Sequence, residues 1–338
     1  MTKKTLMAWM VLLLGYKSVM MAIIIASLTI IANTFYVIFC FTKLNVKIDF
    51  HSPDKHVLKE ISAFSGFIAL SAIADQINWS VDKILLGRYW GPAVTAVYSV
   101  SSTIQSLYMQ ISTAISNVFI PRVNRMVSEG ESNETLTALF IRIGRFQMLV
   151  LLPILLGFIF LGKRFISVWC PTGYDEAYPI AMMLMIPSTL PYLQNIGIAI
   201  QTAQNRHKFR SVLYILMATV NFALSIPLCK LYGGVGCAVG TAISLIIANG
   251  LVMNIYYHKI IRLNVVKYWS SMLSFMPTVI ASTGLGLTMN YFLNIDSWLK
   301  LFVCIGMFCI VYILMVWFTA MNREEKKSVL SMMNRRER

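Results

Sequence analysis

The sequence is short of charged residues. Asp, Glu, Lys and Arg make up 13% of its 338 residues, whereas soluble domains contain about a quarter. Hydrophobic residues make up 57% and gather in long runs. This composition predicts a polytopic membrane protein. It disfavours a nucleic-acid-binding protein, because the basic residues form no compact domain.

Residue patterns for metal binding and catalysis are also absent. The six cysteines form no Cys-x-x-Cys pair, and the four histidines fall in separate loops without metal-ligand spacing. The sequence has no nucleophile elbow, no glycine-rich phosphate loop and no pair of carboxylates in a loop. A membrane-bound polymerase or acyltransferase usually needs a large extracytoplasmic loop, and the longest outer loop here, about 162–176, is short. We therefore expect no metal site, no cofactor and no enzymatic activity.

What the sequence has instead is a series of apolar runs long enough to span a bilayer, which takes about 20 helical residues. They predict an all-α bundle of nine or ten transmembrane helices. The expected spans are about 19–42, 61–87, 92–120, 139–162, 177–203, 211–231, 235–257, 268–293 and 298–320, preceded by a short or partial span at 5–16. The first span is expected to be retained, since no small-residue cleavage site follows Lys3 and Lys4.

The basic residues alternate between successive connections. Twenty of the 29 Lys and Arg residues lie in the segments 43–60, 122–145, 206–210, 259–267 and 323–338, and six lie on the opposite side or at its helix ends. Because basic residues collect in cytoplasmic loops, we predict that these segments, including the C-terminus, are cytoplasmic. This bias accounts for most of the net charge of +15.

The rest of the chain is organised around residues 61–121, where two long apolar segments meet at a Tyr-Trp-Gly-Pro turn (89–92). Asp75, Asn78 and Asp82 share one face of the first segment, at i, i+3 and i+7. The second segment carries polar residues at spacings of three or four: Tyr98, Ser101, Gln105, Tyr108, Ser112 and Ser116. A polar stripe facing lipid would be costly. We therefore expect these faces to line a shared water-filled groove, and a dry seam is the alternative.

Several spans contain helix-breaking residues. Pro187 and Pro191 lie four apart in one span, and each removes a backbone donor. Gly233, Gly234 and Gly236 form a turn between two spans, and small residues let membrane helices pack closely. We expect structural roles for these residues. Broken helices around a cavity are also typical of transporters.

Four motifs are similar to a known family. The segments 79–100 (WSVDKILLGRYWGPAVTAVYSV), 114–121 (AISNVFIP), 163–169 (KRFISVW) and 231–244 (LYGGVGCAVGTAIS) follow in the expected order. Together they resemble bacterial polysaccharide flippases, the O-antigen and capsule unit transporters of the multidrug/oligosaccharidyl-lipid/polysaccharide exporter superfamily. The resemblance covers roughly residues 20–265.

This resemblance implies a domain organisation. Residues 1–60 would be a remnant of the first helical lobe with a cytoplasmic linker, 61–260 a six-helix second lobe, 261–321 two additional helices and 322–338 a basic tail. Most of the first lobe is absent from this resemblance, and three alternatives stay open: a truncated reading frame, an internal starting methionine, or one part of a split transporter. The expected partners are a lipid-linked oligosaccharide, membrane lipids, and either a chain supplying the missing lobe or polysaccharide assembly proteins. The implied function is flipping of lipid-linked oligosaccharides by alternating access across the bacterial inner membrane.

The candidate site residues follow from both arguments. Asp75 is the candidate for a coupling carboxylate that binds Na⁺ or carries a proton, because ionisable groups at mid-membrane are costly; a satisfied structural carboxylate is the alternative. Asp82 is expected to be structural. Candidates to line the cavity, with helix–helix hydrogen bonding as the alternative, are Asn78, Tyr98, Gln105, Tyr108, Gln194, Asn195 and Asn221.

Two basic residues complete the candidate set. Arg142 and Arg145, at the inner end of a span, could contact the substrate phosphate or anchor the helix to the interface. A cation-coupled antiporter of the related multidrug and toxic-compound extrusion family is the second functional hypothesis. It would need an acidic cavity, and this sequence favours neutral polar and basic groups.

Overall fold

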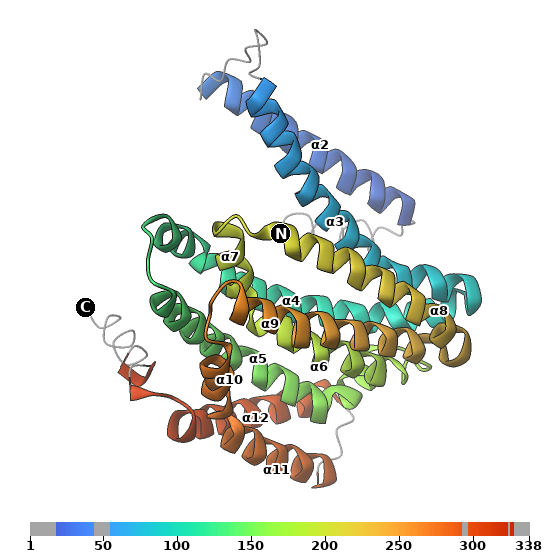
Figure 1. Ribbon diagram of the computed structural model, residues 1–338. Coiled ribbons are helices and arrows are strands. Elements are labelled where there is room, and N and C mark those ends of the chain that lie inside the picture. Colours follow the sequence, from blue (N-terminus) through green and yellow to red (C-terminus); the bar gives the residue numbers. More distant parts are fainter. Residues whose placement is uncertain (1–17, 44–54, 293–296, 324, 328–338) are drawn as a thin grey trace. The chain divides into compact units, whose positions relative to one another are not determined.

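The computed structural model describes residues 18–43, 55–292, 297–323 and 325–327, and within these ranges all regular structure is helical. The helices are α2 (Ser18–Lys43), α3 (Lys55–Tyr89), α4 (Gly91–Ser128), α5 (Asn133–Trp169), α6 (Ala177–Leu193), α7 (Asn195–Ala203), α8 (His207–Leu245), the π-helix η1 (Ile246–Val252), α9 (Met253–Lys259), α10 (Val265–Leu273), α11 (Met276–Phe292) and α12 (Trp298–Thr319). The all-α fold expected from the sequence is confirmed (Figure 1). The expected span at 5–16 lies outside the described residues.

Four helical segments are long and apolar enough to cross a membrane: Ala26–Lys43, Asn133–Trp169, Lys208–Lys259 and Trp298–Thr319. Two bent pairs become two more if each is one span: α6 with α7, bent by 42°, and α10 with α11, bent by 41°. Helices α3 and α4 have the length but are less apolar, because polar residues run along them. The nine spans expected between 19 and 320 all coincide with helix.

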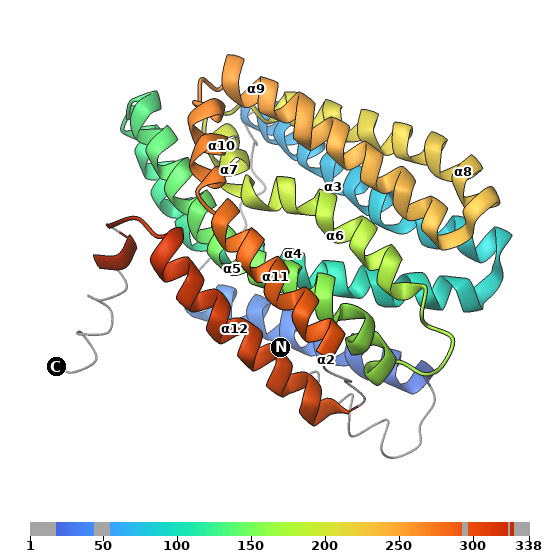
Figure 2. The same ribbon diagram turned by 90° about the horizontal axis from the view of Figure 1, so that it is seen from below.

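The segment Lys208–Lys259 is a hairpin of two antiparallel helices. Gly233 has φ 58° and ψ −132°, which breaks the helix at that point. Hydrogen bonds pair Tyr214 with Asn249 and Asn221 with Thr241 across the two arms. A Cβ atom added to Gly236 would lie 1.9 Å from the carbonyl oxygen of Leu228, so the arms touch closely at the turn. The hairpin runs along one side of the bundle (Figure 2).

By internal contacts, the chain divides into two compact units, Met1–Ala63 and Phe64–Arg338. The described part of the first unit is α2 and the start of α3. In the second unit, α4 packs against α6 and α7, and α5 packs against α6 and against α10, α11 and α12. One apolar core joins α5 to α4 and α7–α10, and a second joins α5 to α11 and α12. Helix α5 therefore links the six-helix part of the bundle to its last two spans.

Candidate functional site

The carboxylate predicted for coupling lies on α3. The structure places Asp75, Asn78 and Asp82 on that helix at the expected spacing. The side chains of Asp75 and Asn78 are outside what the structure describes, so their roles stay predictions. The Asp82 side chain is described, and it is 2% exposed. It is the one of the three whose surroundings can be examined.

Asp82 joins three helical elements through hydroxyl groups. The Tyr98 hydroxyl on α4 donates to Asp82 Oδ2 at 2.5 Å, and the Thr241 hydroxyl on α8 donates to the same oxygen at 2.8 Å. Thr241 Oγ1 also lies 3.2 Å from Asn221 Oδ1, to which the Ser225 hydroxyl donates at 3.1 Å. Oxygen atoms from three elements thus surround one buried carboxylate.

The second oxygen of this carboxylate has no hydrogen-bond partner among the side chains that the structure describes. Asp82 Oδ1 is buried, and a polar atom left without a hydrogen bond away from water is costly. A proton on this oxygen, or a hard cation that prefers oxygen ligands, would relieve the cost. The described residues contain no cluster of three or more His, Cys, Asp or Glu side chains for a metal ion. Any cation held here would rely on hydroxyl and amide oxygens beside the single carboxylate.

The predicted polar stripe of α4 forms a dry seam with α6. Gln105 donates to the Ser188 hydroxyl at 2.7 Å, and the hydroxyl groups of Tyr108 and Thr189 lie 3.1 Å apart. Gln105 and Tyr108 are each 1% exposed. These contacts correspond to the helix–helix alternative kept open above, since neither side chain lines a recess described below.

The broken helix α6–α7 has its free carbonyl groups satisfied by other helices. The chain bends after Leu193, within two residues of Pro191. The Ser112 hydroxyl on α4 donates to the Tyr192 carbonyl at 2.7 Å, and the Tyr268 hydroxyl on α10 donates to the Leu193 carbonyl at 2.6 Å. The break is therefore a fixed feature of the bundle, consistent with the need to satisfy every backbone group inside a bilayer.

Helix α4 carries a second polar stripe, displaced by about 100° from the first. Its members recur at spacings of three or four, with one gap of seven at the end: Thr95, Ser99, Ser102, Ser106, Gln110, Thr113, Asn117 and Asn124. The first four are half-buried and the last four are exposed. The hydrogen bonds that this face forms stay within α4, for example from Ser99 to the Thr95 carbonyl and from Gln110 to Ser106. A membrane helix with an exposed amide-bearing face calls for water, substrate or a polar partner opposite it.

The C-terminal half of this second stripe forms one wall of a recess of about 320 Å³. Its lining comes from α4, α7 and α8: Thr113, Ser116, Asn117, Ile120, Asn124, Asn195, Ile198, Ala199, Thr202 and Arg210. Asn195, a predicted cavity residue, is in this set, and it also donates to Ser112 Oγ at 2.9 Å. The recess thus combines amide and hydroxyl groups with one guanidinium group.

The other predicted residues lie elsewhere. Gln194 is 2% exposed and donates to Asn254 Oδ1 at 2.7 Å, while Asn221 belongs to the Asp82 cluster. Arg142 is exposed. None of the three lines the recess between α4, α7 and α8.

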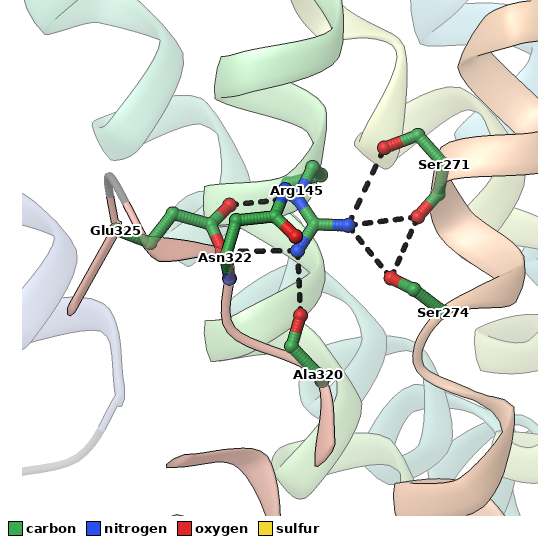
Figure 3. A network of polar contacts seen from close by, with 6 residues as sticks. All are labelled: Arg145, Ser271, Ser274, Ala320, Asn322 and Glu325. Carbon is green, nitrogen blue, oxygen red and sulfur yellow. Dashed lines mark hydrogen bonds and ion pairs between the residues drawn. The ribbon is translucent and has the colours of Figure 1, made fainter. Parts of the chain in front are cut away.

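Arg145 is held in an internal clamp (Figure 3). Its Nε and Nη2 donate to the two carboxylate oxygens of Glu325 at 2.6 and 2.9 Å, and Nη2 also donates to the Ala320 carbonyl at 2.7 Å. Nη1 donates to the Ser271 carbonyl at 2.9 Å and to Ser274 Oγ at 2.7 Å. A guanidinium group has five N–H donors, so none is left for a substrate phosphate. The anchoring alternative fits this geometry.

The clamp also sets the ionisation of Glu325, which lies beyond the last span. Burial alone would raise the pKa of this carboxyl. Hydrogen bonds from Arg145 and from the Asn322 amide, with the positive charges of Arg145 and Arg142, outweigh burial and hold the pKa below its usual value. The clamp therefore contains an ionised carboxylate, bound bidentately, that ties the C-terminal segment to α5.

The second stripe of α4 and Arg210 were not among the site residues predicted from the sequence. The signal was present, since residues 95–117 repeat polar side chains every three or four positions on a face next to the first one. Periodicity alone cannot tell which of two adjacent polar faces packs against a neighbouring helix. The partners of Asp82 on α8 were missed for a related reason, because Thr241 and Ser225 lie more than 140 residues away in the sequence.

An all-helical bundle with several helices long and apolar enough to cross a bilayer defines a polytopic membrane protein. Residues 2–179 match the model of the polysaccharide biosynthesis protein family. The chain belongs to this family. The resemblance to polysaccharide flippases that its motifs indicate is confirmed at that level.

Two curated relatives are similar to the chain. One is the teichuronic acid biosynthesis protein TuaB of Bacillus subtilis (strain 168), 23% identical over 77% of this chain and 54% of that protein. Another is a putative O-antigen transporter of Escherichia coli (strain K12), 27% identical over 52% of this chain and 42% of that protein. The chain spans about half the length of these relatives. No solved structure matches it.

Proposed function

We propose that the chain takes part in flipping lipid-linked oligosaccharides across the bacterial inner membrane, for the assembly of a surface polysaccharide. The observation that carries this proposal is the second polar stripe of α4, which ends at the polar recess and forms no hydrogen bond to another helix among the described side chains. A sugar head group cannot cross hydrocarbon unaided, whereas its lipid tail can stay in the bilayer. A polar helix face open sideways to lipid meets both needs.

Alternating access requires a second wall opposite α4. We propose that a partner lobe forms this wall, either from another part of the whole protein or from a separate polypeptide. The half-length match to the two relatives supports a partner of comparable size. The sugar unit would then be held between hydroxyl and amide groups on both walls.

The energy for transport would come from a cation gradient. We propose Asp82 as a coupling group beside Asp75, because its buried Oδ1 lacks a partner while hydroxyls from α4 and α8 hold Oδ2. Uptake of H⁺ or Na⁺ would remove the unsatisfied charge, and its release would favour separation of α3 from α8. This role for Asp82 differs from the purely structural role expected from the sequence.

The role of the second stripe can be tested by replacing two of its polar side chains with apolar ones. In cells that make the polysaccharide, the double variant Gln110→Leu with Asn117→Leu is expected to lose most surface polysaccharide at an unchanged protein level. Val118→Leu is the matched control, since Val118 neighbours the stripe, is apolar and is 73% exposed. Normal polysaccharide in the double variant would refute a substrate path along α4.

The multidrug alternative is disfavoured by the family assignment. A deletion strain provides the direct comparison. We expect it to lose surface polysaccharide while its susceptibility to cationic drugs stays that of the parent strain. Increased susceptibility to these drugs without any loss of polysaccharide would reverse this ranking.

A further inference from the structure

A second recess lies at the open end of the α8–α9 hairpin. It has a volume of about 440 Å³, and its lining residues are Asn133, Gln204, Arg206, Ile260, Ile261 and Arg262. They come from three places in the chain: the first residue of α5, the connection before α8 and the connection after α9. The recess is separate from the one between α4, α7 and α8, with which it shares no lining residue.

The recess is positively charged. Arg206 and Arg262 line it, Lys208 and Lys259 are close to them in sequence and exposed, and neither connection contains Asp or Glu. The ion pairs formed among the described residues include neither arginine. The N-terminus of α5 adds a partial positive charge where Asn133 meets the recess, and the exposed Glu134 in the same first turn offsets part of it. Two guanidinium groups that form no ion pair among the described residues make a site for an anion.

Arg262 occupies a backbone position that glycine would favour. Its φ is 64°, in the left-handed region, which is sterically unfavourable for residues other than glycine. Its neighbours Ile261 and Leu263 are 2% and 1% exposed and pack into the core. Hydrogen bonds from the Ile261 amide to the Tyr256 carbonyl and from the Leu263 amide to the Tyr257 carbonyl fix the turn. A bias of basic residues towards one side explains an arginine in this loop, but not its place at the strained position.

Arg206, in the connection before α8, is also fixed by hydrogen bonds. Its carbonyl accepts from Gln201 Nε2 at 2.9 Å and from the Tyr256 hydroxyl at 3.3 Å. Its Nη1 donates to the Ile260 carbonyl, which joins the two connections. The other N–H groups of this guanidinium form no hydrogen bond within the described part of the chain. Hydrogen bonds therefore fix both backbones, and the Ile260 carbonyl holds the Arg206 guanidinium before any ligand arrives.

We propose that this recess binds a phosphate group between Arg206 and Arg262. Phosphate suits two forked donors because each can take a pair of oxygens. The group could belong to the head group of an anionic membrane lipid or to a soluble phosphate, and both share this chemistry. The proposal does not depend on the flippase assignment.

The test uses the full chain purified in a neutral detergent. The probes are dioctanoyl-phosphatidylglycerol and inorganic phosphate, with dioctanoyl-phosphatidylcholine and chloride as references, and dissociation constants are measured by calorimetry. We expect tighter binding of at least one probe than of its reference. Arg262→Gly should weaken that binding by about tenfold or more, the loss of one charge-assisted contact.

Arg262→Gly removes the side chain without disturbing the backbone, because glycine adopts this φ without strain. Its thermal stability should equal or exceed that of the wild type, which separates loss of the ligand from misfolding. Lys163→Gln, an exposed basic residue outside the recess, is the control and should bind as the wild type does. Preference for the lipid assigns the site to the membrane, and preference for inorganic phosphate assigns it to a soluble ligand. Equal binding by Arg262→Gly and wild type, or no binding above the references, would overturn the proposal.

Discussion

At the scale of single residues, the most heavily bonded side chain of the described structure is Arg145. It ties α5 to the joint between α10 and α11 and to the end of α12. Replacing it by Met would leave Glu325 and two carbonyl groups without their donor. We expect a loss of about 2–4 kcal/mol in the free energy of unfolding, measured by thermal or denaturant unfolding in detergent. Glu325→Gln should cost less, because Gln can still accept from the guanidinium.

The same pair makes stability depend on pH. The pKa of Glu325 is lower in the folded protein than its usual 4.5, so folding favours the ionised form. This stabilising contribution is present above pH 4.5 and disappears as the pH falls through the lowered pKa. Wild type should therefore lose more stability than Glu325→Gln as the pH falls below 4.5. Identical acid profiles for the two proteins would show that the pair contributes nothing.

Asp82 allows another prediction at this scale. Asp82→Asn keeps the shape and, with its amide oxygen at the Oδ2 position, the hydrogen bonds from Tyr98 and Thr241, but it cannot bind a proton or carry charge. We expect normal protein levels with a loss of most surface polysaccharide, assayed in a deletion strain complemented by each variant. Tyr98→Phe, which removes only the hydroxyl donor at 2.5 Å, should keep part of the activity. Full activity of Asp82→Asn would remove Asp82 from coupling and restore the structural role first expected.

At the scale of elements, the α8 hairpin depends on two glycines. A methyl group at Gly236 would overlap the Leu228 carbonyl, and Gly233 has a positive φ. We expect Gly236→Ala to destabilise the protein by about 3 kcal/mol or more, through forced separation of the arms. Gly284→Ala and Gly306→Ala are matched controls, since nothing lies within 4 Å of an added Cβ at either position. Both should be neutral or slightly stabilising, as judged from the amount of folded protein recovered in detergent.

The helices also show how much of the fold could be predicted from the sequence. Apolar runs of more than 20 residues predicted the helices well, because the need to satisfy every backbone group leaves a membrane chain little choice of structure. The glycine turn at 233 was predicted as a boundary between spans, and the structure has its hairpin there. The contacts of α4 could not be predicted in the same way. Gln105 and Gln110 are equally polar, and only the position of α6 decides which of them is buried.

At the scale of the whole molecule, the connections of the second unit lie at two ends of the bundle. Those before α5, before α8 and after α9 share one end, because residues from all three line the basic recess. We predict that this end is cytoplasmic. Cysteines placed at Glu131 and Asn205 in a cysteine-free background should react with a membrane-impermeant maleimide only after the cells are opened. A cysteine at Thr172, on the other side, should react in intact cells, and the reverse pattern would invert the topology.

The polar contacts that join distant helices were the part of the molecule least predictable from the sequence. The candidate site residues were sought along single helices, but the structure gathers groups from distant segments: Asp82 with Thr241, and Arg145 with Glu325. Such pairs leave no periodic signal in a single sequence. The family assignment, by contrast, followed from short motifs whose order along the chain is specific.

The two polar faces of α4 affect how this helix is inserted into the membrane during synthesis. A helix carrying hydroxyl and amide groups over much of its circumference partitions poorly from the translocation channel into lipid by itself. The neighbouring α5, which is long and apolar, has no such difficulty. Helix α4 must therefore leave the channel in the company of later segments, above all α6, whose Ser188 and Thr189 cover one of its faces. Insertion of α4 would then wait until about a hundred further residues have been synthesised after α4 begins. In a ribosome-stalled chain ending before α6, α4 should therefore crosslink to the channel and not to lipid, although the apolar spans around it can already insert.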